Sequence, residues 1–77
     1  MLTLAQLTKN QPAKVISIEG GEGARQKLQN LGIREGVTIK KVAGMFIHGP
    51  IVVEVGHTQI GLGKGMASKV MVEPLEK

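Results

Sequence analysis

The sequence contains no cysteine, no aspartate, no tryptophan and no tyrosine among its 77 residues, and Phe46 is its one aromatic residue. Without cysteine the chain can form neither a disulfide nor a thiolate metal site. Without aspartate it lacks a Ser-His-Asp triad and the aspartate that holds Mg²⁺ in nucleotide hydrolases. A single aromatic residue also disfavours binding to single-stranded nucleic acid, in which bases stack on aromatic side chains.

Long hydrophobic runs and a signal peptide are also missing. No apolar stretch approaches the roughly 18–20 residues of a membrane span, and no basic residue precedes the first apolar residues. These features favour a cytoplasmic protein without membrane insertion, organised as a single domain over residues 1–77. The net charge of +4 favours a partner with a negative surface, but charge alone does not choose among protein, membrane and nucleic acid.

The sequence also offers no candidate catalytic residues. Ser17 and Ser68 have no general base near them in the sequence, and no pair of glutamates suggests acid–base chemistry. The glycines of residues 20–23 resemble a phosphate-binding loop, but Gln26 takes the place of the third glycine and Glu22 would repel a phosphate. We therefore expect a protein that is not an enzyme and has no evident cofactor.

One short amphipathic helix is predicted within residues 23–36. Ala24, Leu28 and Leu31 recur at i, i+4 and i+7, which places them on one face. Gly32 stands where a helix end requires a left-handed residue, and Ile33 follows at the position that folds back onto Leu28.

Five short strands are predicted around this helix, because runs rich in β-branched residues alternate with glycine-containing turns. They are Ala13–Ile18, Val37–Val42, Ile51–Val55, Thr58–Leu62 and Lys69–Glu73. Thr3 and Gln6 suggest a capped turn at Leu4–Leu7, and the interrupted alternation at Lys40-Lys41 suggests a bulge. So many strands in so short a chain predict a mainly β fold, a small, partly closed five-stranded barrel with one short α-helix.

Three blocks of the sequence resemble the FeoA family of accessory proteins in bacterial ferrous iron uptake. They are L-x-x-L-G-I-x-x-G at residues 28–36, G-P followed by I-V-V at residues 49–53, and L-G-K-G-M-A-S-K-V-M-V at residues 62–72. The resemblance extends from about Leu4 to Glu73. It departs from the family at Gln11-Pro12, where glycine is common, and at Glu35, where proline is common.

The resemblance implies an SH3-like barrel and a partner. That partner is FeoB, a membrane ferrous iron transporter with a cytosolic GTP-binding domain. We expect a non-catalytic adaptor that docks on the cytosolic part of FeoB and modulates it, and whose only association with the membrane is through that partner. The sequence leaves open whether the chain also forms a homo-oligomer.

The candidate contact residues are charged or apolar side chains on the helix, the turn after it and a predicted hairpin tip. Apolar residues at a loop tip are costly to expose and often mark a docking site, although the tip can instead fold over the core. Basic residues around the helix and next strand, Lys40 and Lys41 included, form either an electrostatic patch or an ordinary solvated face. The contact candidates are Arg25, Lys27, Leu31, Gly32, Ile33, Arg34, Met45, Phe46 and Ile47.

Two alternatives remain open. One is a small basic barrel that binds nucleic acid, which salt-sensitive binding to RNA or DNA would reveal. The other is a regulatory domain that binds a transition metal weakly. Fe(II) accepts imidazole and carboxylate ligands, and His48, Glu54 and His57 are the candidate ligands. Fe(II) enters through the family context, and the plainer reading is two surface histidines.

Overall fold

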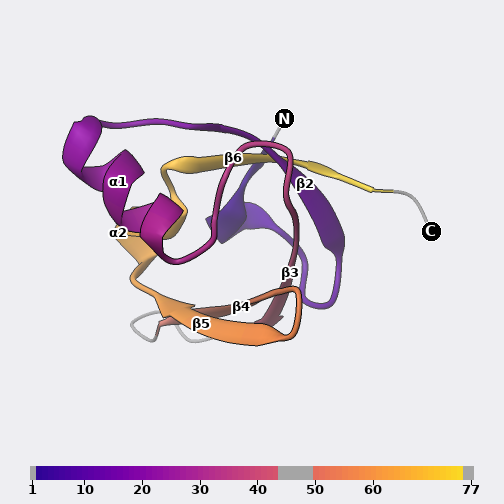
Figure 1. Cartoon of the computed structure of the whole chain (residues 1–77). Coiled ribbons are helices and arrows are strands. Elements are labelled where there is room, and N and C mark those ends of the chain that lie inside the picture. Colours follow the sequence, from indigo (N-terminus) through magenta and orange to yellow (C-terminus); the bar gives the residue numbers. More distant parts are fainter. Residues whose placement is uncertain (1, 44–49, 76–77) are drawn as a thin grey trace.

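The computed structural model describes residues 2–43 and 50–75 of the chain. It contains six strands, one 3₁₀ helix and two α-helices, α1 and α2, in these residues (Figure 1). In chain order they are β1 (Leu2–Thr3), η1 (Leu4–Gln6), β2 (Pro12–Ile18), α1 (Glu22–Asn30), β3 (Thr38–Ala43), β4 (Ile51–Val55), β5 (Thr58–Leu62), α2 (Lys64–Ala67) and β6 (Val70–Pro74).

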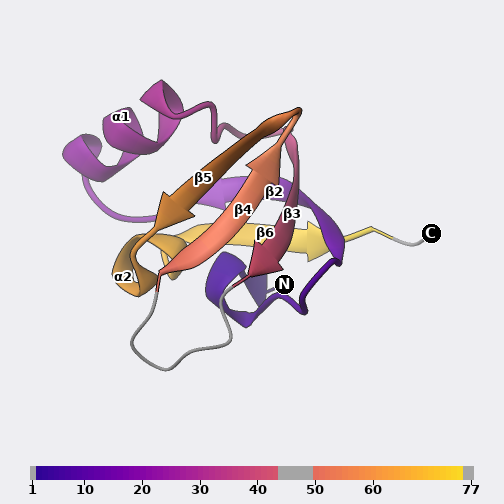
Figure 2. The same cartoon turned by 90° about the horizontal axis from the view of Figure 1, so that it is seen from below.

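The six strands form one antiparallel sheet in the order β1-β6-β2-β3-β4-β5. The sheet curls around a common core without closing, since β1 and β5 lie at its two ends and do not pair (Figure 2). The connection that carries α1 projects to one side of this sheet in both views (Figures 1 and 2). This is the partly open, mainly β architecture that the sequence predicted, and it is SH3-like.

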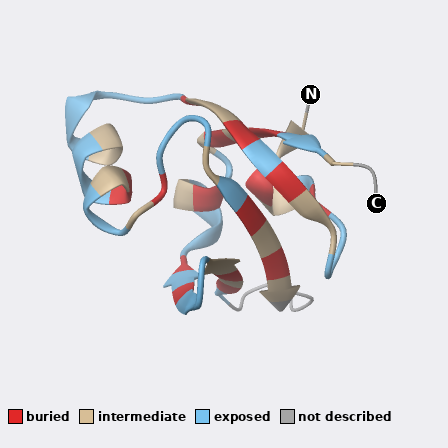
Figure 3. Cartoon of the chain, turned by 45° about the vertical axis from the view of Figure 1, so that its right-hand side comes forward, coloured by how far each residue is buried: buried red, intermediate tan, exposed pale blue. Residues whose placement is uncertain are grey.

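The core is aliphatic and follows the alternation of the strands. Ile51 and Val53 are buried on β4, and Val70 and Val72 are buried on β6, with a half-buried residue between the members of each pair. Figure 3 shows buried and less buried positions alternating along strands of the sheet. Successive side chains of a strand point to opposite faces, so this pattern assigns one face of each strand to the core. η1 adds the buried side chain of Leu4 to the core, and Leu7, just after η1, is buried there as well.

The five predicted strands are all confirmed, with ends that differ by at most one residue. The sequence missed the sixth strand, β1, in which Leu2 pairs with Val72, a residue near the other end of the sequence. Two residues are too few to show the alternation of apolar and polar residues that predicts a strand. β1 is defined by its pairing with the distant strand β6. The short helix α2 joins β5 to β6.

The predicted end of α1 is confirmed. Gly32 has a φ of +93°, and its N–H donates to the Gln29 carbonyl at 3.0 Å. The N–H of Ile33 donates to the Leu28 carbonyl at 2.9 Å. These two bonds define a Schellman motif, which satisfies carbonyls at the helix end and turns the chain back toward the core.

A bulge interrupts β3 beside the predicted position, because the register with β4 shifts between Lys41 and Ala43. Lys41 lies before this shift, in regular register with Val53, and is buried. Its Nζ donates to the carbonyls of Leu7 at 3.0 Å and Ala5 at 3.1 Å. The sequence treated Lys41 as part of a solvent-facing basic group, and this was wrong. Lys41 is two residues after the buried Ile39, so the alternation of the strand places both side chains on the core face.

The predicted hairpin loop at residues 43–50 lies largely outside the described residues. None of the helices in the described part of the chain is long and apolar enough to cross a membrane.

Candidate docking surface

Helix α1 is held to the sheet by few side chains. Leu28 is its one buried residue, and Ile33, just after the helix, is buried in the same cluster. Glu22, Gly23, Gln26, Lys27 and Asn30 are exposed. Most of the helix surface therefore faces solvent and is available to another molecule.

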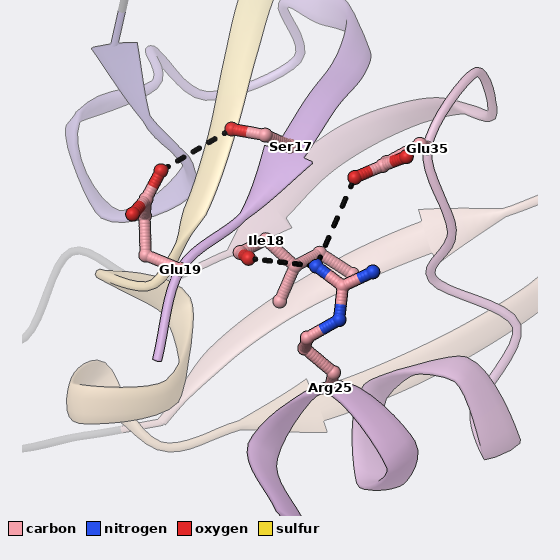
Figure 4. Close-up of polar contacts among 5 residues, drawn as sticks. All are labelled: Ser17, Ile18, Glu19, Arg25 and Glu35. Atoms are coloured by element: carbon pink, nitrogen blue, oxygen red, sulfur yellow. Dashed lines mark hydrogen bonds and ion pairs between the residues drawn. The ribbon is translucent and has the colours of Figure 1, made fainter. Parts of the chain in front are cut away.

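Arg25 provides the polar attachment of α1 to the rest of the fold (Figure 4). Its Nη1 donates to the carbonyl of Ile18, at the end of β2, over 3.2 Å. The same nitrogen lies 3.9 Å from Oε2 of Glu35, in the connection to β3. The guanidinium thus joins the helix to both neighbouring segments. Arg25 was predicted as a partner contact, but its Nη1 already contacts Ile18 and Glu35 within the chain.

Leu31 is the one large hydrophobic residue that is exposed in the described part of the chain, with 39% of its surface accessible. The sequence placed it on the buried face with Leu28. The helix ends at Asn30, and the Schellman turn brings Ile33 into the core instead. Leu31 is therefore left outside the core, where a single exposed leucine is ordinary on a protein surface, and it stays a contact candidate.

The other predicted contact residues of this region divide into two groups. Lys27 and Arg34 are exposed, on α1 and in the connection after it. Ile33 is fully buried, so its side chain belongs to the core and cannot contact a partner. Gly32 serves the turn through its positive φ. Leu31 therefore stands between two exposed cations in the sequence, four residues after Lys27 and three before Arg34.

The five basic residues that the sequence grouped together do not form one free patch. Lys41 is buried, and Lys40 Nζ lies 3.7 Å from Oε1 of Glu54 across the β3–β4 pair. Arg25 is engaged with Ile18 and Glu35. The exposed positive charge near Leu31 is thus carried by Lys27 and Arg34.

The described residues contain no group of three histidine or acidic side chains able to hold a metal ion. Glu54 is half-buried beside Lys40, and His57 is exposed in the turn between β4 and β5. His48, the third candidate ligand, lies outside the described residues, as do Met45, Phe46 and Ile47 of the predicted hairpin tip.

An aliphatic, partly open SH3-like sheet carries a laterally attached helix. An exposed leucine follows the helix, between Lys27 and Arg34 in the sequence. The FeoA domain family matches residues 2–74, which is nearly the whole chain. The chain belongs to the FeoA family.

Individual relatives also belong with FeoA by name. The chain is 33% identical over 76 residues to a Methanocaldococcus jannaschii protein that carries the name Fe(2+) transport protein A, covering 99% of this chain and 90% of that protein. It is 38% identical to an iron uptake regulatory protein (FeoA) of known crystal structure, with a TM-score of 0.88 and 96% of each chain covered.

A third relative adds a description of the fold. FeoA of Stenotrophomonas maltophilia, solved in complex with zinc, is 28% identical, with a TM-score of 0.81, 95% of this chain and 91% of that chain covered. It is described as a procaryotic SH3 domain protein and suggested to act as a bacterial ferrous iron transport activating factor.

Proposed function

We propose that this protein is a non-catalytic accessory protein of ferrous iron uptake, which docks on the cytosolic part of a FeoB-like transporter and modulates it. Membership of the FeoA family, with relatives named for Fe(2+) transport, supports the transport context. The docking surface is argued from the exposure of Leu31, since no other large hydrophobic side chain of the described residues is exposed.

Leu31 would supply the apolar centre of the contact, and the exposed cations Lys27 and Arg34 would surround it. Protein interfaces commonly combine a buried apolar anchor with a polar rim, and rim charges act mainly on the rate of encounter. Modulation requires no chemistry in this chain. It requires that the protein bind one state of the transporter more tightly than another, because a ligand shifts an equilibrium only by its differential affinity.

The first test is titration calorimetry with the cytosolic domain of the FeoB encoded by the same organism, with GTP analogue, with GDP and without nucleotide. We expect binding whose affinity depends on the nucleotide. If the domain does not bind in any of these three states, the proposed docking is wrong.

The second test is the variant Leu31→Ser, with Leu31→Met as the matched control. Removing an apolar anchor at an interface commonly costs about 2 kcal/mol or more, which is roughly a thirtyfold loss of affinity. Methionine keeps an apolar side chain of similar size and should bind within a few-fold of the original protein. Because the side chain is exposed, both variants should unfold at nearly the original urea midpoint. Equal binding by the serine and methionine variants would move the interface elsewhere.

A further inference from the structure

A second surface lies at the free edge of β5, at the opposite end of the sheet from β1. β5 pairs with β4 along one side, and no other described strand or loop bonds to its backbone. Figure 2 shows β5 as the outermost strand beyond β4. An unpaired edge strand offers a row of backbone donors and acceptors to another chain.

The turn before β5 determines which of its amides point outward. The turn has two residues, Gly56 with a φ of +62° and His57 without a positive φ. This combination matches a type II′ turn. In such a hairpin the first pair after the turn, Val55 and Thr58, exchanges two backbone hydrogen bonds, and the following pairs alternate.

It follows that Ile60 and Leu62, like Thr58, direct their backbone groups toward β4. Gln59 and Gly61 direct theirs away from the sheet. The free edge therefore presents two N–H donors and two carbonyl acceptors. Both of these residues are exposed, and a Cβ added to Gly61 would meet no atom within 4 Å.

The edge also lacks the usual protection against pairing with another strand. Natural edge strands are commonly blocked by lysine, proline, a bulge or a covering segment. β5 reads T-Q-I-G-L and contains no charge and no proline, and its register with β4 shows no bulge. β1, at the other end of the sheet, is only two residues long and offers little edge.

We propose that β5 of one molecule pairs antiparallel with β5 of a second copy, about a two-fold axis through Ile60. In this register Gln59 lies opposite Gly61 of the second copy, and all four outward groups of each strand are satisfied by four hydrogen bonds. The Gln59 side chain then faces a glycine, so nothing opposes it. The uncharged strands bring no like charges together.

Other two-fold registers satisfy fewer groups. An axis through Gly61 brings Gln59 against Gly63, whose carbonyl already accepts a hydrogen bond from Ala67 over 3.0 Å. An axis through Gln59 brings Gly61 against the turn residue His57. The observed strand is thus complementary to itself in one register. An edge of five residues buries less than the roughly 800 Å² per partner of a stable interface, so the association is reversible and requires high protein concentration.

Sedimentation equilibrium of the intact protein tests the inference, with concentrations from about 10 μM to about 1 mM to suit a small interface. We expect the mean mass to rise from 8.2 kDa toward twice that value. The variant pair is Gly61→Pro and Gly61→Ala. Proline removes the outward N–H but leaves the bonds to β4, as proline can on an edge strand, whereas alanine keeps the donor.

Gly61→Pro should weaken self-association about tenfold or more, because it removes one donor from each copy, while Gly61→Ala should associate like the original protein. Amide exchange of Gln59 and Gly61 in the unmodified protein should slow as concentration rises, which gives a readout independent of either variant's folding. A monomer at every concentration would overturn the inference. A dimer in which the amides of Gln59 and Gly61 exchange as fast as in the monomer would also overturn it, because the interface would then lie away from the β5 edge.

Discussion

Lys41 is the one buried charged residue in the described part of the chain, and its ammonium group has two backbone acceptors. Its ammonium group donates to the carbonyls of Ala5 and Leu7 and so joins β3 to the segment around η1. Two carbonyls near the end of a short helix gain a donor in this way. The lysine therefore contributes to the fold and is removed from the candidate docking surface.

Replacing Lys41 with methionine should destabilise the fold by about 1–3 kcal/mol, because two partly or fully buried carbonyls lose their donor. Lys40→Met is the matched control. Its ammonium lies in a half-exposed pair with Glu54, and such pairs contribute about 0–1 kcal/mol. Urea unfolding of both variants measures the difference. Equal unfolding midpoints for the two variants would show that Lys41 is no more important than its exposed neighbour.

At the scale of elements, α1 depends on how it ends. The helix has one buried residue of its own, Leu28, so the turn that places Ile33 in the core provides much of its attachment. Gly32 allows that turn, since its φ of +93° is strained for any residue with a Cβ.

Gly32→Ala should therefore cost about 1–2 kcal/mol of folding free energy. Gly23→Ala is the natural control, because Gly23 lies inside α1 without a positive φ and an added Cβ there meets nothing within 4 Å. It should stabilise the protein by about 0.5–1 kcal/mol through helix propensity. Thermal melts of the two variants should shift in opposite directions. Shifts of the same sign would contradict this account of the helix end.

The sequence predicted local features well and long-range ones less well. β4 and β5 were placed at their observed bounds, because alternation and a glycine turn are signals within a few residues. Helical periodicity placed Leu31 on the face of Leu28, because a periodic pattern extends a helix past its end, although Leu31 was also named as a contact candidate. The burial of Ile33 against the helix end was predicted from the Gly32 turn. Lys41 looked like surface, because a charged side chain rarely occupies the core-facing position that alternation with Ile39 gives it.

The candidate site was predictable only in part, because some of its features depend on contacts between segments that are distant in the sequence. Lys27 and Arg34 are exposed as expected, since charged residues rarely lie inside without partners. The engagement of Arg25 with Ile18 and Glu35 depends on how the connection folds back over the end of β2, which no local pattern encodes.

At the scale of the whole molecule, the chain combines a net charge of +4 with the proposed docking surface around the exposed Leu31. These two features should affect different steps of binding. Charge raises the rate of encounter with a negative partner and is screened by salt, whereas an apolar anchor acts on the lifetime of the complex. The proposed function therefore predicts that salt and the Leu31 variants separate in a kinetic experiment.

Surface plasmon resonance with the FeoB cytosolic domain immobilised would measure both rates. Raising ionic strength from about 0.01 M to about 1 M shortens the Debye length from about 30 Å to about 3 Å, so the association rate should fall several-fold. The dissociation rate should change little. Leu31→Ser should show the reverse, a faster dissociation with a similar association rate. If salt instead abolishes binding and RNA or DNA binds with the same steep salt dependence, the basic nucleic-acid-binding alternative replaces the adaptor, because release of counterions from phosphates gives that dependence.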